Sequence, residues 1–325
     1  MSDLTRINRN DRARKKAQAN NPSHRLRTFS FLTTTIVILL LIAGSYFGSL
    51  PKVEHIPDNF QFNRQTWMEW VPSRTQYVAY VSYEQAYAVS SNPQLFGSQP
   101  ILQLYQLNFA LNPESVLYEV DIQLPPSVQN LASVTVSVIK IRGDVLSVLS
   151  AEVAKAKVAK SQYDGYTIAN LLIVNPTDQK LLTGYLSIAG ESVVVSSDPG
   201  SGKVGVEAIL DQYTSKAPSL FDAVSVRRGV YSSGVTDQPY VGLFVGAFPS
   251  QLNNTRMIVK SVLQDSNGVL VTRSLAFSGQ DQALGQYGEA QRVYRNADTY
   301  RMLDEWLVIS YHYSIDKLRG ELTGI

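Results

Sequence analysis

The sequence predicts an α+β protein in which an N-terminal transmembrane helix is followed by two duplicated β-α-β-β-α units, each an antiparallel sheet with its helices on one face. Three observations lead to this fold class. An uncharged apolar stretch lies near the N-terminus, strand-like and helix-like segments alternate after it, and the same order of segments recurs later in the chain. The hydrophobic fraction of 44% is ordinary for a globular core, and the absence of cysteine excludes disulfides, thiolate nucleophiles and cysteine-ligated metals.

The first expected element is the apolar stretch over residues 28–50, which carries no charge and is aliphatic from Ile36 to Ile42. About 20 helical residues at roughly 1.5 Å rise cover a hydrocarbon core of about 30 Å, so this stretch predicts a transmembrane helix. The alternative is a cleaved secretory signal, with Ala43-Gly44-Ser45 as the cleavage site. The long basic region in front of the stretch favours an uncleaved anchor.

The segment over residues 1–27 is a basic tail with eight basic and two acidic residues. Basic residues beside a transmembrane helix usually stay in the cytoplasm. The tail therefore predicts a single-pass protein of the cell membrane with a cytoplasmic N-terminus and an extracytoplasmic remainder. The expected topology determinants are Arg12, Arg14, Lys15, Lys16, Arg25 and Arg27. Without the tail, the 29 basic and 27 acidic residues of the chain fall to 21 basic and 25 acidic, which argues against nucleic acid as a partner.

The exported part is expected to begin with a stalk over residues 51–71, where prolines interrupt any sustained period. Trp67 and Trp70 in this stalk are expected to dock on the domain and not on the bilayer. A first α+β domain is expected over residues 72–216. Its repeated unit comprises a strand over 133–141, a helix over 144–160, a strand pair over 185–197 and a helix that begins at Asp198-Pro199.

The second α+β domain is expected over residues 217–325 and repeats this order. It comprises a strand over 268–278, a helix capped by Ser278, a strand pair over 300–313 and a last helix capped by Ser314. Both copies therefore read β-α-β-β-α, which favours two sandwiches, each with its own antiparallel sheet.

Recurring phrases in these units give the chain a resemblance to a family. SVVVSS and WLVISY end the strand pairs, AILDQY and KLRGEL lie in the helices that follow, and VPSRTQYVAYVSYEQA, from Val71 to Ala86, opens the domain. In these phrases the chain resembles a family of secreted or membrane-anchored proteins known as a domain of unknown function, which has tandem α+β units. The resemblance covers roughly Val71 to Ile325, and it implies no catalytic residue and no substrate.

The chain holds only fragments of known catalytic and binding motifs. SDPGSGKVG over 197–205 resembles a phosphate-binding loop, but Ser197 and Val204 stand where that loop needs a glycine and a hydroxyl residue. The histidines are not placed to share a metal, and no nucleophile elbow accompanies them; they are His24, His55 and His312. Asn253-Asn254-Thr255 is a glycosylation sequon, so Asn253 is the possible glycan acceptor.

The sequence therefore predicts a membrane-anchored extracytoplasmic protein that acts by binding or assembly, not by catalysis, and uses no cofactor. Its expected partners are the lipid bilayer and, at the outer membrane face, another protein or a second copy of this chain. Two alternatives stay open. One is an accessory subunit of a larger membrane complex, for which Gly44 and Gly48 offer small-residue spacing in the anchor. The other is an extracytoplasmic hydrolase that uses a pair of carboxylates.

Overall fold

The computed structural model of the chain describes residues 31–42, 51–89, 113–126, 132–174, 181–215, 217–234, 240–246, 252–265 and 268–314. The chain divides into two compact units, Met1–Lys52 and Val53–Ile325.

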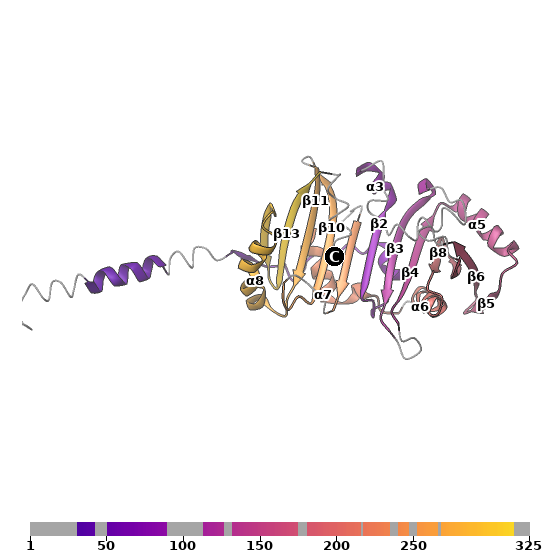
Figure 1. The fold of residues 1–325 in the computed structure, drawn as a ribbon, viewed down its shortest axis with the longest axis horizontal. Helices are drawn as coiled ribbons and strands as arrows, with labels where there is room; N and C mark the ends of the chain where they lie inside the picture. Colours follow the sequence, from indigo (N-terminus) through magenta and orange to yellow (C-terminus); the bar gives the residue numbers. More distant parts are fainter. Residues whose placement is uncertain are drawn as a thin grey trace, which may run out of the picture. The chain divides into compact units, whose positions relative to one another are not determined.

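The first unit contains a helix over residues 31–42 (Figure 1). Among its described residues the chain has no helix that meets both the length and the apolarity required of a membrane span. The prediction of a transmembrane helix over 28–50 is therefore wrong; within that range the structure describes residues 31–42 as a helix. The localisation remains a prediction, because its expected determinants lie outside the described residues: Arg12, Arg14, Lys15, Lys16, Arg25 and Arg27.

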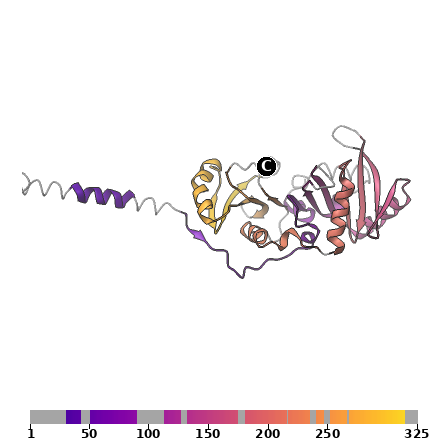
Figure 2. The ribbon, with the colours of Figure 1, turned by 90° about the horizontal axis from the view of Figure 1, so that it is seen from below.

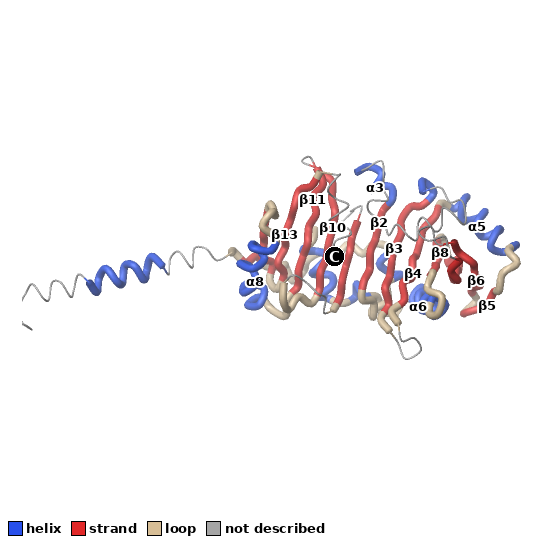
Figure 3. Tube along the Cα trace, viewed as in Figure 1, coloured by secondary structure: helices blue, strands red, loops and turns tan. Residues whose placement is uncertain are grey.

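The second unit is built on one continuous sheet of 13 strands, in the order β1-β12-β13-β11-β10-β9-β2-β3-β4-β8-β7-β6-β5 (Figures 1 and 3). β1 is parallel to β12, and the other neighbours are antiparallel. The strands are β1 (Val53–Glu54), β2 (Tyr77–Ser82), β3 (Val116–Leu124), β4 (Val134–Ile141), β5 (Lys160–Tyr163), β6 (Tyr166–Val174), β7 (Leu181–Ala189), β8 (Ser192–Ser196), β9 (Tyr240–Val245), β10 (Met257–Asp265), β11 (Gly268–Ala276), β12 (Thr299–Leu303) and β13 (Trp306–Tyr313).

The prediction of two duplicated units with separate sheets is wrong, because β2 and β9 join both halves of the chain in this one sheet. Val78 of β2 lies opposite Ile122 of β3 on one side and opposite Leu243 of β9 on the other. Separate sheets would leave β2 and β9 as apolar edge strands with unpaired backbone groups, and their pairing satisfies these groups. The edges of the observed sheet are short strands instead, of two residues in β1 and four in β5.

One face of the sheet, here called the α7 face, carries Val78, Leu243 and Trp306. Four helical elements cover it: α6 (Gly202–Ser215), α7 (Val224–Ser232) and the 3-10 helices η1 (Thr66–Trp70) and η4 (Leu220–Asp222) (Figure 2). Trp67 and Trp70 of η1 are both buried in this layer, so these tryptophans dock on the domain, as expected.

The opposite face, here called the α5 face, is also covered. α3 (Tyr83–Val89), α5 (Gly143–Lys155) and α8 (Gln280–Val293) pack on it, and the short η3 (Pro113–Ser115) precedes β3. The prediction of helices on one face is therefore wrong. In β2, five of the six residues are buried, so the strand has no solvent-facing side. The helix expected after Ser314 falls outside the described residues.

Candidate functional site

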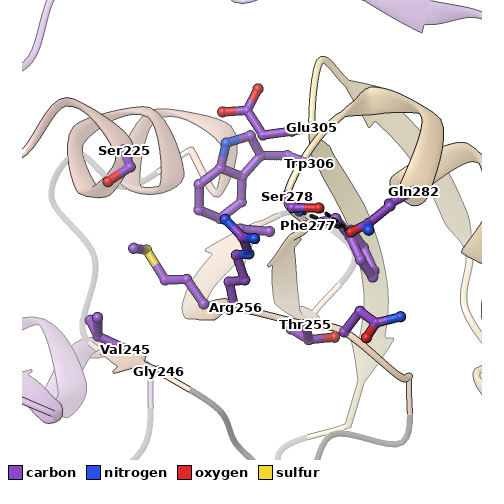
Figure 4. A pocket seen from close by; sticks show the side chains of 13 residues that line it. Ser225, Val245, Gly246, Thr255, Arg256, Phe277, Ser278, Gln282, Glu305 and Trp306 are labelled. Atoms are coloured by element: carbon purple, nitrogen blue, oxygen red, sulfur yellow. Dashed lines mark hydrogen bonds between the residues drawn. The ribbon is translucent and has the colours of Figure 1, made fainter.

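A pocket of about 690 Å³ lies where the ends of β9, β10, β11 and β13 meet α7 and α8 (Figure 4). It is lined by Ser225, Val245, Gly246, Asn254, Thr255, Arg256, Met257, Ala276, Phe277, Ser278, Gln282, Glu305 and Trp306. Most of these residues come from strand ends and the turns beside them, where loops can vary without loss of the sheet.

The floor of the pocket is a row of apolar residues set by the register of the sheet. Met257 lies opposite Val245 on one side and Ala276 on the other, and Ala276 lies opposite Trp306. Side chains directly opposite one another share a face, so this row presents a continuous apolar surface across β9, β10, β11 and β13. Met257, Ala276 and Trp306 are buried.

Trp306, at the β13 end of this row, is held by close packing against α7. It is 1% exposed, and a Cβ added at Gly229 of α7 would lie 2.4 Å from its Cη2 atom. A glycine at this position is what allows the helix to approach the indole so closely. Within the described residues the indole Nε1 has no hydrogen-bond partner. A buried donor without an acceptor is rare in proteins, and this one lies in the packed layer between the sheet and α7.

We expect Gly229→Ala to lower the free energy of unfolding by about 1 to 3 kcal/mol, because the added methyl group overpacks the contact with Trp306. The matched control is Gly288→Ala in α8, where an added Cβ meets nothing within 4 Å. This control should gain up to about 1 kcal/mol, since alanine favours the helix. Urea denaturation followed by circular dichroism measures both variants. A Gly229→Ala protein as stable as the control variant would contradict the close contact.

The rim of the pocket carries several hydrogen-bond donors. The backbone N–H of Arg256 donates to the Ala276 carbonyl at 2.8 Å, and its side chain extends toward Trp306 (Figure 4). No ion pair of its guanidinium occurs among the described residues. Gln282 Oε1 accepts hydrogen bonds from the backbone N–H of Ser278, at 3.3 Å, and from the Ser278 hydroxyl. The amide nitrogen of Gln282 is therefore left to donate.

Glu305 is the one carboxylate among the lining residues, and its charge is already engaged. Its Oε2 atom lies 3.3 Å from Arg228 Nη2, which also lies 2.5 Å from Asp304 Oδ2. Partial burial acts to raise the pKa of Asp304, but hydrogen bonds from His55 and from the Ile56 N–H, together with the Arg228 charge, bring this pKa below its usual value. Asp304 is therefore ionised at neutral pH, and Arg228 bridges two carboxylates.

The sequon lies next to this pocket. Asn253 is exposed, Asn254 lines the pocket with a positive φ of 65°, and the Thr255 hydroxyl donates to the Leu252 carbonyl at 2.9 Å. Asn253 remains a predicted glycan acceptor.

The histidines in the described residues lie at separate places. His55 Nδ1 is 2.6 Å from Asp304 Oδ1, and His312 Nδ1 is 2.8 Å from Asp298 Oδ2. His24 falls outside the described residues. No cluster of three or more histidine, cysteine, aspartate or glutamate side chains in the described part of the chain could hold a metal ion.

Two neighbouring carboxylates, Glu119 and Asp121, lie in the core and not in the pocket. They are 1% and 4% exposed. The Tyr83 hydroxyl donates to Glu119 Oε2 at 2.7 Å, and the Ser137 hydroxyl donates to Asp121 Oδ1. Burial, and then the charge of Glu119, raises the pKa of Tyr83. This arrangement is a hydrogen-bonded core cluster, which differs from an open carboxylate pair with room for a substrate.

A second pocket, of about 590 Å³, lies between α5 and the strands β5, β6 and β7. Its polar groups are engaged with one another. Lys160 Nζ donates to the Ala154 carbonyl at 2.7 Å, and Gln162 Nε2 donates to Thr167 Oγ1 at 2.9 Å. The pocket beside Trp306 is larger and keeps more donors for a ligand, so it is the stronger candidate.

The sequence gives roles to Ser278, as a helix cap, and to Thr255, as part of the sequon, but it predicts no residue of this pocket as a ligand contact. Val245, Met257, Ala276 and Trp306 are ordinary apolar residues in or beside predicted strands, and only the register of the sheet makes them neighbours. The one available signal is Arg256, a cation directly before a buried strand.

Comparison with protein-family models finds no matching family, and comparison with curated proteins finds no matching relative. Solved structures of TP0453 match at a distance. Its crystal form IV has a TM-score of 0.46 and 10% identity, over 81% of this chain and 97% of that one. Crystal form III has a TM-score of 0.47 and 11% identity, over 79% and 98% of the two chains. These values are too low to assign a function, so the pocket has to be interpreted from its own residues.

Proposed function

We propose that the protein is a non-catalytic binding protein whose pocket beside Trp306 holds a small organic molecule. The observation that carries this proposal is the combination of an apolar floor across four strand ends with a rim of hydrogen-bond donors. Small-molecule sites are concave and mostly apolar, with a few polar groups that orient the ligand, and their volumes run from about 300 to 1,000 Å³. A volume of about 690 Å³ falls within that range.

The polar groups of the pocket favour binding over hydrolysis. Among the described residues, Glu305 is the one carboxylate that lines it and no histidine does, and the charge of Glu305 is engaged by Arg228. A carboxylate-based hydrolase needs two carboxyl groups on opposite sides of the bond that breaks. Glu119 and Asp121 do not supply them, because both are buried in the core away from this lining.

The test is a titration of the full chain with N-phenyl-1-naphthylamine, a neutral apolar probe whose fluorescence rises in apolar surroundings. Ser225→Phe fills the mouth of the pocket from the first turn of α7, at a position that is exposed and tolerates a larger side chain. The matched control is Val224→Phe, one residue earlier in the same turn, 56% exposed and not part of the lining. We expect saturable binding that weakens about tenfold or more in Ser225→Phe and stays within about twofold in Val224→Phe.

Two results would defeat this proposal. One is the absence of saturable probe binding. The other is equal binding by the two variants, which would place the probe elsewhere. Circular dichroism of both variants checks that a weakened signal reports the pocket and not a loss of fold.

A further inference from the structure

We infer that the ligand of this pocket is an organic anion, a carboxylate carried on an apolar body. This inference rests on the proposed function and adds the chemical class of the ligand. Two features of the pocket lead to it, beside the apolar row: the charge of Arg256 and the start of α7.

Arg256 supplies the cation. Its guanidinium extends into the pocket, with Trp306 above it and Thr255 below it in Figure 4. Among the described residues it forms no ion pair, whereas Arg228 nearby is bound to both Asp304 and Glu305. The charge of Arg256 is therefore available to a carboxylate, for which the guanidinium offers paired donors.

The start of α7 also favours an anionic ligand. The helix begins at Val224 with Ala223 as its N-cap residue; no side chain caps it, and its first turn holds no acidic residue. Ser225 in that turn lines the pocket. The first N–H groups of a helix lack intrahelical acceptors and carry partial positive charge, so they favour an anion nearby.

The amide group of Gln282 fits an acceptor on the ligand. Gln282 Oε1 already accepts from Ser278, so the amide nitrogen of Gln282 is left to donate. The negative charge of Glu305 would disfavour an anionic ligand. However, Glu305 lies across the indole from Arg256 in Figure 4 and is bound by Arg228. The apolar row from Val245 to Trp306 then receives the body of the ligand.

The test uses three probes with the same eight-carbon chain and different charge: octanoate, octanamide and octylammonium. Isothermal titration calorimetry measures their binding to the full chain. We expect octanoate to bind at least tenfold more tightly than octanamide, and octylammonium to bind most weakly. In Arg256→Gln the preference for octanoate over octanamide should disappear, with octanamide affinity unchanged within about twofold. The matched control is Arg295→Gln, an exposed arginine beyond the C-terminal end of α8, which should keep the preference.

The outcomes separate this inference from the proposal beneath it. If octanamide or octylammonium binds as tightly as octanoate, or if Arg256→Gln keeps the preference, the ligand class is wrong while small-molecule binding stands. If none of the three probes binds at millimolar concentration, and N-phenyl-1-naphthylamine does not bind either, the proposed function itself fails and the inference falls with it.

Discussion

Replacing Leu243 by aspartate is expected to lower the free energy of unfolding by about 4 kcal/mol or more, because it buries a charge without a partner. Leu243 is 0% exposed and lies in β9 between Val78 of β2 and Val259 of β10. It therefore sits at the junction of the two halves of the sheet. Urea denaturation, followed by circular dichroism for the whole sheet and by tryptophan fluorescence, measures the loss.

The same experiment tests whether the halves fold together. Of the three tryptophans, Trp67 and Trp70 report on the layer around η1 and Trp306 reports on the second half of the sheet. One continuous sheet therefore predicts that circular dichroism and tryptophan fluorescence give a single coincident transition. The matched control is Leu263→Asp, the same chemical change at a residue of β10 that is 38% exposed. It should cost less than about 1 kcal/mol. Two separate transitions in Leu243→Asp, with one half unaffected, would contradict the continuous sheet.

Most local elements are predictable from sequence because each leaves a local pattern. The strand expected over 133–141 is β4 over Val134–Ile141, and the strand pair expected over 300–313 is β12 and β13. The helix expected over 144–160 is α5, which ends earlier, at Lys155. Alternation and helical spacing act over a few residues, so they mark elements even when the partners are unknown.

The pairing of the strands is not predictable in the same way. Tyr77 of β2 lies opposite Phe244 of β9, far along the chain, and nothing local to either strand selects the other. One signal was nevertheless present. The strands YVAYVS and SVVVS are apolar without alternation and almost wholly buried, which is typical of strands covered on both faces. This pattern favours a sheet with layers on both faces over one with helices on a single face.

Helix starts show how tertiary contacts override a local signal. Asp198-Pro199 is a typical helix start, yet α6 begins at Gly202. The Asp198 carboxylate instead accepts the backbone N–H of Thr135 at 2.8 Å, and its carbonyl accepts the N–H of Gly202. A capping residue is thus used to join the helix to β4, and only the assembled sheet reveals that choice.

The site is the least predictable part, because its chemistry depends on what is absent near each group. Arg256 and Arg228 are the same residue type, and no local sequence pattern distinguishes their roles. The fold gives Arg228 two carboxylates and places Arg256 at the pocket. Similarly, the burial of Trp306 depends on the close approach of Gly229, which is far away in sequence. Such differences arise from packing, for which the sequence holds no short-range pattern.

Replacing Trp67 by alanine is expected to lower the free energy of unfolding by about 3 to 5 kcal/mol, the range for truncating a large buried aromatic residue. Trp67 is 2% exposed. Its ring stacks on Tyr80 of β2 with centroids 4.6 Å apart and meets the ring of Phe221 edge-on at 5.1 Å. Hydrogen bonds also join the two segments: Ser219 Oγ donates to the Met68 carbonyl at 2.7 Å, and the Leu220 N–H donates to the Val71 carbonyl at 3.1 Å.

The loss should therefore spread beyond one contact. Without the indole, η1 and η4 lose the ring contacts that join them to each other and to β2. The hydrogen bonds beside Trp67 keep the surrounding backbone in place, so collapse fills the cavity only in part and the free energy of unfolding falls accordingly. The conservative variant Trp67→Phe keeps the stack on Tyr80 and should lose about half as much. Urea denaturation of both variants gives the comparison. A loss below about 1 kcal/mol in Trp67→Ala would mean that the segment before β2 does not pack on the sheet, as in a free stalk.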